Sequence, residues 1–87
     1  MPKAHEENGF SFSFYSNDHL PMHVHCFKAG ELCVFLLGEV DGVMPGIREN
    51  VSMTLANVRR ALAILEANQA KMIAKWQEHL GQGESNE

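Results

Sequence analysis

The residues best suited to chemistry lie in one short segment, Asp18-His19-Leu20-Pro21-Met22-His23-Val24-His25, which holds three of the five histidines beside an aspartate. Histidine titrates near neutral pH, so two imidazoles in one cleft can divide general-base and general-acid work. Such a pair suits metal-independent RNA cleavage, in which one imidazole deprotonates a 2′-hydroxyl and the other protonates the leaving oxygen. The candidate catalytic residues are therefore His19, His23 and His25, together with Asp18, which would orient a histidine tautomer.

The same side chains offer a metal site as the alternative. If residues 23–28 form a strand, His23 and His25 leave the same face roughly 6–7 Å apart. Imidazole suits zinc, copper, iron and nickel, and His19 or Asp18 would supply a third ligand. Three protein ligands plus water is the pattern of catalytic zinc sites. On this interpretation His19, His23 and His25 bind a divalent transition metal such as zinc.

Strands are expected to carry this segment. Residues 10–15 alternate aromatic and polar side chains, which is the period-two signature of a half-buried strand. Residues 23–28 alternate as well, and residues 31–37, apolar on both faces, suit a central strand. Residues 38–50 hold either one more short strand or only a loop. Paired antiparallel, the first two strands would place Ser11, Ser13 and Tyr15 on the histidine face, where they can hydrogen-bond a phosphate.

The turn at Ala29-Gly30 decides whether Cys33 joins the histidines. A two-residue turn places Cys26 opposite Cys33, on the face away from the histidines, whereas a three-residue loop places His25 opposite Cys33. A type I′ two-residue turn needs positive φ at both centres, which alanine disfavours, so we expect the longer loop. That register would make a His-His-Cys metal site available. The plainer interpretation of both cysteines is small, buried, apolar side chains.

Residues 52–80 are expected to be helical, with Ser52 as the N-cap and Gly81 as the stop. A straight helix of this length would measure about 42 Å. A domain of this size has a diameter of roughly 30 Å. We therefore expect a break near Asn68-Gln69, so that both halves cover the sheet; the alternative is a protruding helix that pairs with a partner. Apolar residues recur at helical spacing: Leu55, Val58, Leu62, Leu65, Met72, Trp76 and Leu80.

The length of 87 residues allows one core and one domain. The expected fold class is α+β: an antiparallel sheet of three or four strands covered by a C-terminal helical segment. This domain would span residues 10–81, with flexible tails at residues 1–9 and 82–87. No apolar run is long enough for a membrane helix, and the polar N-terminus lacks a signal-peptide region, so the expected location is cytoplasmic.

Charge argues against a chain that binds nucleic acid through its whole surface, because the net charge is −4. Residues 53–80, however, carry four basic and two acidic side chains, a net charge of +2. Arg59 and Arg60 in this region are candidate contacts to RNA or to an acidic partner. The plainer interpretation is a solvated helix face.

Two stretches resemble a bacterial family called domain of unknown function 4160. The first is Tyr15-Ser16-Asn17-Asp18-His19 followed by Pro21 and His23-Val24-His25, and the second, weaker one is the ending Ala67-Asn68 with Trp76-Gln77-Glu78-His79-Leu80-Gly81. The resemblance covers about residues 10–81. The chain departs from the family by having Leu20 and Met22 around Pro21, where the family often has a further proline.

The resemblance implies a small cytosolic bacterial protein, often encoded beside a second family, domain of unknown function 2442. This gene arrangement suggests a toxin–antitoxin module with a cognate partner protein. The positions that match the family's motif are Asp18, His19, His23 and His25. Trp76 matches as a residue of the core.

Three functions fit these observations. The first is a toxin-like component that acts on RNA as a ribonuclease-type hydrolase through the histidine cluster. The second is a metal-binding or regulatory module. The third is a non-enzymatic interaction protein, an antitoxin or adaptor, that meets its partner through the helix or an open sheet edge. A sheet this small leaves room for a shallow site, which favours a polymeric or protein ligand.

Overall fold

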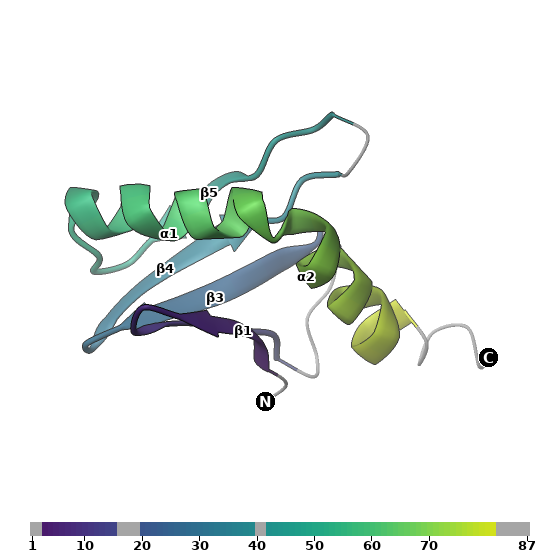
Figure 1. The fold of residues 1–87 in the computed structure, drawn as a ribbon, viewed down its shortest axis with the longest axis horizontal. Coiled ribbons are helices and arrows are strands. Elements are labelled where there is room, and N and C mark those ends of the chain that lie inside the picture. Colours follow the sequence, from purple (N-terminus) through teal and green to yellow (C-terminus); the bar gives the residue numbers. More distant parts are fainter. Residues whose placement is uncertain (1–2, 16–19, 40–41, 82–87) are drawn as a thin grey trace.

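The fold is a five-stranded antiparallel sheet with helices packed on one face (Figure 1). The computed structural model describes residues 3–15, 20–39 and 42–81. The strands follow one another in space in chain order. The elements are β1 (Lys3–Glu7), β2 (Phe10–Ser13), β3 (His23–Lys28), β4 (Glu31–Leu36), β5 (Gly46–Asn50), α1 (Leu55–Ala67), α2 (Gln69–Trp76) and the π-helical η1 (Gln77–Gly81).

The core lies between one face of the sheet and both helices. On the sheet side it takes the alternate residues that the strand pattern predicts, and Phe12, Phe14 and Phe35 are fully buried. Burying an aromatic side chain of this size contributes about 1.5–3 kcal/mol. The helices contribute Val58, Ala61, Ile64, Leu65, Met72, Ile73 and Trp76. The fold class is therefore α+β, as expected.

No helix of the described residues covers the other face of the sheet. We call this surface the open face and define it by the paired side chains of its three central strands: Ser11, Ser13, His23, His25, Phe27, Leu32, Val34 and Leu36. The pairings Ser11–Phe27 and Ser13–His25 confirm that the two serines share the histidine face.

The sheet has five strands rather than the three or four expected. The additional strand β1 falls within the residues predicted to be an N-terminal tail, and its sequence is almost wholly polar. The Ala4 side chain of β1 is buried in the core, and His5 Nδ1 accepts a hydrogen bond of 2.9 Å from Lys71 Nζ on α2. These two contacts hold β1 against the helical layer. The predicted tail at 82–87 lies outside the described residues.

The expected register of the β3–β4 hairpin is wrong. Lys28 pairs with Glu31, so Ala29 and Gly30 form a two-residue turn, and both have positive φ, at 49° and 84°. Cys26 therefore faces Cys33 in the core, not the histidines. Burial of the strands' apolar face outweighs the modest cost of a left-handed alanine.

The helix begins at Leu55, later than predicted, and Thr54 rather than Ser52 is the N-cap. The Thr54 side chain accepts a hydrogen bond from the Asn57 backbone N–H. Ser52 instead extends the pairing of β5 with β4, because its hydroxyl accepts the Leu32 N–H at 3.0 Å. Ser52 therefore does not cap the helix, because its hydroxyl is hydrogen-bonded at the edge of the sheet, and the N-cap lies two residues later at Thr54.

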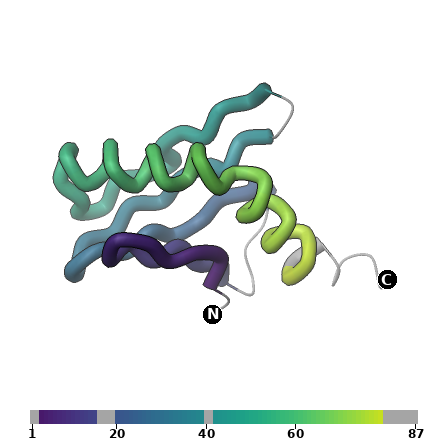
Figure 2. Tube along the Cα trace, viewed as in Figure 1, coloured from purple at the N-terminus to yellow at the C-terminus, as the bar shows by residue number. Residues whose placement is uncertain are grey.

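The helical segment breaks at Asn68, as its length predicts. Asn68 has φ −122° and ψ 19°, and its side chain donates to the Ile64 carbonyl at 2.8 Å. Beyond it, α2 turns away from the axis of α1 toward β1 (Figure 2). The molecule measures 41 × 27 × 20 Å along its principal axes. The bend keeps both helices on the sheet.

Gln69 ties the start of α2 to the β4–β5 connection. Its Nε2 donates to the carbonyls of Leu37 and Val43, each at 2.9 Å, and lies 3.3 Å from that of Glu39. The gap in the apolar series at position 69 is therefore a polar link between layers.

Gln69→Ala is expected to lower the free energy of unfolding by about 1–2 kcal/mol, because it removes the side-chain donor to the Leu37 carbonyl and one of two donors to the Val43 carbonyl. Urea unfolding followed by circular dichroism measures this change. The matched control is Gln77→Ala, since Gln77 is exposed. Equal unfolding midpoints for the two variants would contradict the linking role of Gln69.

Candidate functional site

His23 and His25 begin β3 and project from the same side of the sheet, as their spacing predicts. Their ring centroids lie 5.6 Å apart in an edge-to-face arrangement. The ring of Tyr15 lies 4.0 Å from that of His25, centroid to centroid. Ser13 is the direct cross-strand partner of His25. The structure therefore brings together both strand histidines, an aromatic ring and a serine at one end of the sheet.

The tautomer of His23 follows from its hydrogen bond. Nδ1 lies 2.8 Å from the carbonyl oxygen of Pro21, and a carbonyl only accepts, so Nδ1 carries the proton. In neutral His23 the basic lone pair is then on Nε2. Proton transfer or metal ligation by this residue would use Nε2.

Trp76 connects this site to the core. Its ring lies 5.4 Å from that of Phe14, edge-on, and 5.4 Å from that of His23. Trp76 is 4% exposed and His23 is 6% exposed. The core position expected for Trp76 is confirmed, and its contact with His23 was not predicted. A single tryptophan at helical spacing gives no sign of which strand residue it meets.

A shallow apolar groove of about 390 Å³ adjoins His23. Pro21, whose carbonyl holds His23, and Leu36, the cross-strand partner of His23, both line it. The other lining residues are Leu20, Met22, Gly38, Glu39, Val43 and Met44. Sequence reasoning missed this groove, because its walls are ordinary apolar residues that two loops bring together.

The remaining histidine-cluster candidates, Asp18 and His19, lie outside the described residues, so their roles stay predictions. Within residues 3–15, 20–39 and 42–81, no three His, Cys, Asp or Glu side chains are grouped closely enough to hold a metal ion. Cys33 does not join His23 and His25, because it lies on the core face. The His-His-Cys site is therefore excluded.

Both cysteines have the properties of buried apolar residues. Burial, with a smaller contribution from the neighbouring Cys33, raises the pKa of the Cys26 thiol to about 12. Burial likewise raises the pKa of Cys33 above its usual value. A thiol must lose its proton to act as a nucleophile or a metal ligand, so neither cysteine is suited to these roles near neutral pH.

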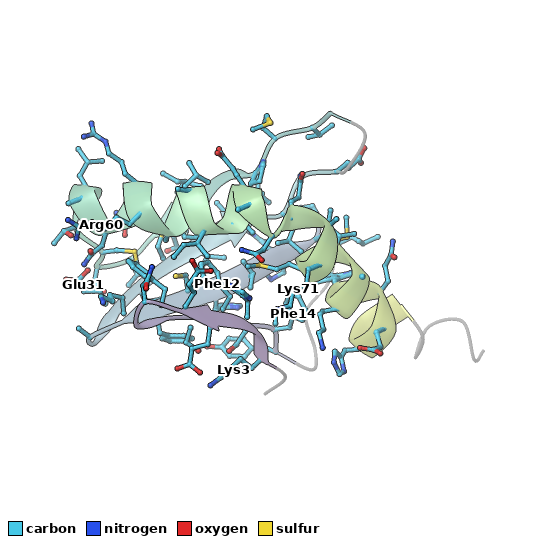
Figure 3. All side chains as sticks on the ribbon, viewed as in Figure 1. Lys3, Phe12, Phe14, Glu31, Arg60 and Lys71 are labelled. Atoms are coloured by element: carbon cyan, nitrogen blue, oxygen red, sulfur yellow. The ribbon has the colours of Figure 1, made fainter. Side chains whose placement is uncertain are left out.

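Arg59 and Arg60 are not part of the histidine site. Both are exposed in the first half of α1, whereas His23 contacts Trp76 at the end of α2. Figure 3 shows Arg60 at one end of the helical layer and Phe14, the neighbour of Trp76, toward the other. A ligand that bound the histidines on the open face would meet these arginines only by passing around the sheet.

These features define a small two-layer α+β protein whose histidine pair lies beside an open sheet face. The chain belongs to the family described as domain of unknown function (DUF4160), whose model matches residues 9–77. No match was found among curated proteins. No solved structure matches either. No helix of the described residues is long and apolar enough to cross a membrane.

Proposed function

We propose that this protein is the toxin-like component of a bacterial two-gene module and that it cleaves RNA in the cytoplasm with His23 and His25. The observation that carries the proposal is the pair of imidazoles on one side of the sheet, with ring centroids 5.6 Å apart. One phosphodiester placed over both rings would meet a base and an acid together.

The reaction would be an internal transfer. One imidazole takes the proton of the 2′-hydroxyl, and the 2′-oxygen forms a bond to phosphorus. The bond from phosphorus to the 5′-oxygen breaks, and the other imidazolium gives that oxygen its proton. The products are a 2′,3′-cyclic phosphate and a 5′-hydroxyl, so no metal or other reactant is consumed.

The surroundings of the histidines support a polymeric substrate. Tyr15 lies against His25 and is 36% exposed, so its ring can stack with an unpaired base. The groove beside His23 is lined in part by Leu36 of the open face, which suits an extended strand. Because the net charge is −4, recognition must come from these local contacts.

His25→Ala is expected to lower the rate of RNA cleavage about 10²–10⁴-fold, the usual contribution of a general acid or base. Cleavage is measured on single-stranded RNA in the presence of EDTA, with the 2′,3′-cyclic phosphate detected by mass spectrometry. Induced expression of the wild-type chain should arrest growth, and His25→Ala should relieve the arrest. His23→Ala should act in the same way, although His23 also packs on Trp76.

The matched control is His79→Ala, because His79 is exposed and its Nε2 lies 3.6 Å from Glu78 Oε1. Circular dichroism confirms that each variant folds. Absence of cleavage and of growth arrest in the wild type would refute the proposal. Cleavage that requires a metal would favour the zinc alternative.

A second candidate function is an antitoxin or adaptor that binds the product of a neighbouring gene of the domain of unknown function 2442 type. It is favoured by exposed apolar residues in β5 and in the segments that precede and follow it: Val43, Met44, Ile47, Val51 and Leu55 are each at least half exposed. Exposed apolar surface is a feature of protein interfaces where it is contiguous. Co-expression of the two chains tests it: Ile47→Lys should abolish co-purification, whereas His25→Ala should leave it intact.

A further inference from the structure

A second hollow lies at the opposite end of β3 from His23, on the helix side of the sheet. It measures about 440 Å³, within the range of small-molecule sites. The β1–β2 turn with the first residue of β2, the last residue of β3 and one side of α1 form its walls. The lining residues are Asn8, Phe10, Lys28, Arg60, Ala63 and Ile64.

Two cationic side chains line this hollow. Lys28 Nζ donates to the Asn8 carbonyl at 3.0 Å and lies 4.9 Å from the centroid of the Phe10 ring. Arg60 Nη1 donates to the Asn57 side-chain oxygen at 3.3 Å. Among the described parts of the chain, no carboxylate oxygen lies within ion-pairing distance of either cation. Two positive charges thus line one hollow without a counter-ion from these residues.

Among the described residues, the acidic side chain joined to Arg60 through Asn57 is Glu31, and its carboxylate is already hydrogen-bonded elsewhere. Glu31 Oε1 accepts hydrogen bonds from the Asn57 side chain at 3.1 Å and from the Thr54 backbone N–H at 3.2 Å. It therefore sits at the N-terminus of α1, where a negative charge is favoured. Asn57 separates it from Arg60, so the guanidinium keeps donors for another acceptor.

The position of Lys28 depends on Gly9. Gly9 has φ +82°, and a Cβ added there would lie 2.6 Å from Lys28 Nζ. A residue without a side chain at this turn therefore lets the ammonium group fold back over Phe10. The cation is held at the hollow by the backbone of one turn and the ring of one strand.

We propose that this hollow binds a phosphate monoester carried on a small apolar body. A guanidinium offers paired N–H donors that match phosphate oxygens, and an ammonium adds a point charge. Ala63, Ile64 and the Lys28 stem supply apolar walls for the body of the ligand. The hollow lies at the opposite end of β3 from His23 and shares no lining residue with the histidine pair, so it does not depend on the proposed RNA cleavage.

Calorimetric titration of the full chain with phenyl phosphate tests the proposal, with phenol, inorganic phosphate and benzoate as comparison ligands. Phenyl phosphate should bind saturably and more tightly than the other three. Lys28→Met and Arg60→Met should each weaken its binding roughly tenfold or more, because each removes a charged hydrogen-bond donor. The matched control is Arg59→Met, which removes the same charge from the neighbouring exposed residue outside the hollow.

Arg60→Met carries the test if Lys28→Met fails to fold, since Arg60 is exposed on α1. Absence of saturable binding, or equal weakening by Arg59→Met, would overturn the site. Phenol binding as tightly as phenyl phosphate would overturn the role of the charge. If inorganic phosphate bound as tightly as phenyl phosphate, the contribution of the apolar body would be refuted. If benzoate bound as tightly, the preference for phosphate over carboxylate would be refuted.

Discussion

Replacing Trp76 with alanine is expected to lower the free energy of unfolding by about 3–5 kcal/mol, the usual cost of removing a buried aromatic side chain. Trp76 is almost fully buried and contacts Phe14 edge-on. A domain of this size has a total stability of roughly 4–13 kcal/mol, so a large part of it would be lost. In this variant the His23 ring should also lose its fixed position, because it packs on Trp76.

Urea unfolding followed by circular dichroism measures the effect of Trp76→Ala. The matched control is Leu55→Ala, because Leu55 is also an apolar helical residue but is 63% exposed. Its unfolding midpoint should stay close to that of the wild type. Trp76→Phe should recover much of the stability by restoring a ring beside Phe14. If Trp76→Ala unfolds at the same urea concentration as Leu55→Ala, the result would contradict the packing of α2 on the sheet through Trp76.

Iodoacetamide is expected to alkylate Cys26 about 1000-fold more slowly in the folded protein than in the unfolded chain near pH 8. Burial is the main cause, and the neighbouring Cys33 adds to it: together they raise the pKa of Cys26 from its usual 9.0 to about 12. The reactive thiolate becomes tenfold rarer for each unit that the pKa rises. The side chain also has no exposed surface, which adds to the protection.

Mass spectrometry of the protein with and without denaturant measures this protection, and the unfolded chain is the control for reagent activity. Rapid alkylation of the native protein would place Cys26 outside the core. The same shift predicts pH dependence. The unfolded chain ionises its thiol first, so stability is full below about pH 9 and falls as pH rises toward about 12, the pKa of folded Cys26.

Much of the fold was predictable from the spacing of apolar residues. Alternation identified β2 and β3 and the face that each presents, because a half-buried strand repeats every two residues. The existence of a break near Asn68-Gln69 was predictable from length, since an unbroken helix would overhang the sheet. The shared face of His23 and His25 followed from the same alternation.

Other features could not be predicted because they depend on contacts between distant residues. The sequence of β1 is polar and gives no strand pattern. This strand is held in place by the burial of Ala4 and by the hydrogen bond between His5 and Lys71 of α2. The register of the β3–β4 turn was missed because β4 is apolar on both faces, so its pattern did not say which face is buried. The aversion of alanine to positive φ favours a longer loop, but packing of the apolar face outweighs that small cost at Ala29.

The candidate site was predicted in part. The sequence indicated His23 and His25 but neither the contact of His23 with Trp76 nor the groove, since both arise where α2 and two loops meet the sheet. Arg59 and Arg60 had been grouped as neighbours in sequence. The structure separates them, because only Arg60 lines the hollow with Lys28.

The order of the strands in the sheet has a consequence for the folding kinetics. Every strand pairs only with its neighbours in the chain, and the β1–β2 and β3–β4 connections are tight turns at one end of the sheet. Contacts of such short sequence separation lose little loop-closure entropy, which lowers the barrier. The two tight hairpins should therefore form early, whereas the end that carries the histidines should order last, when α2 docks against β1.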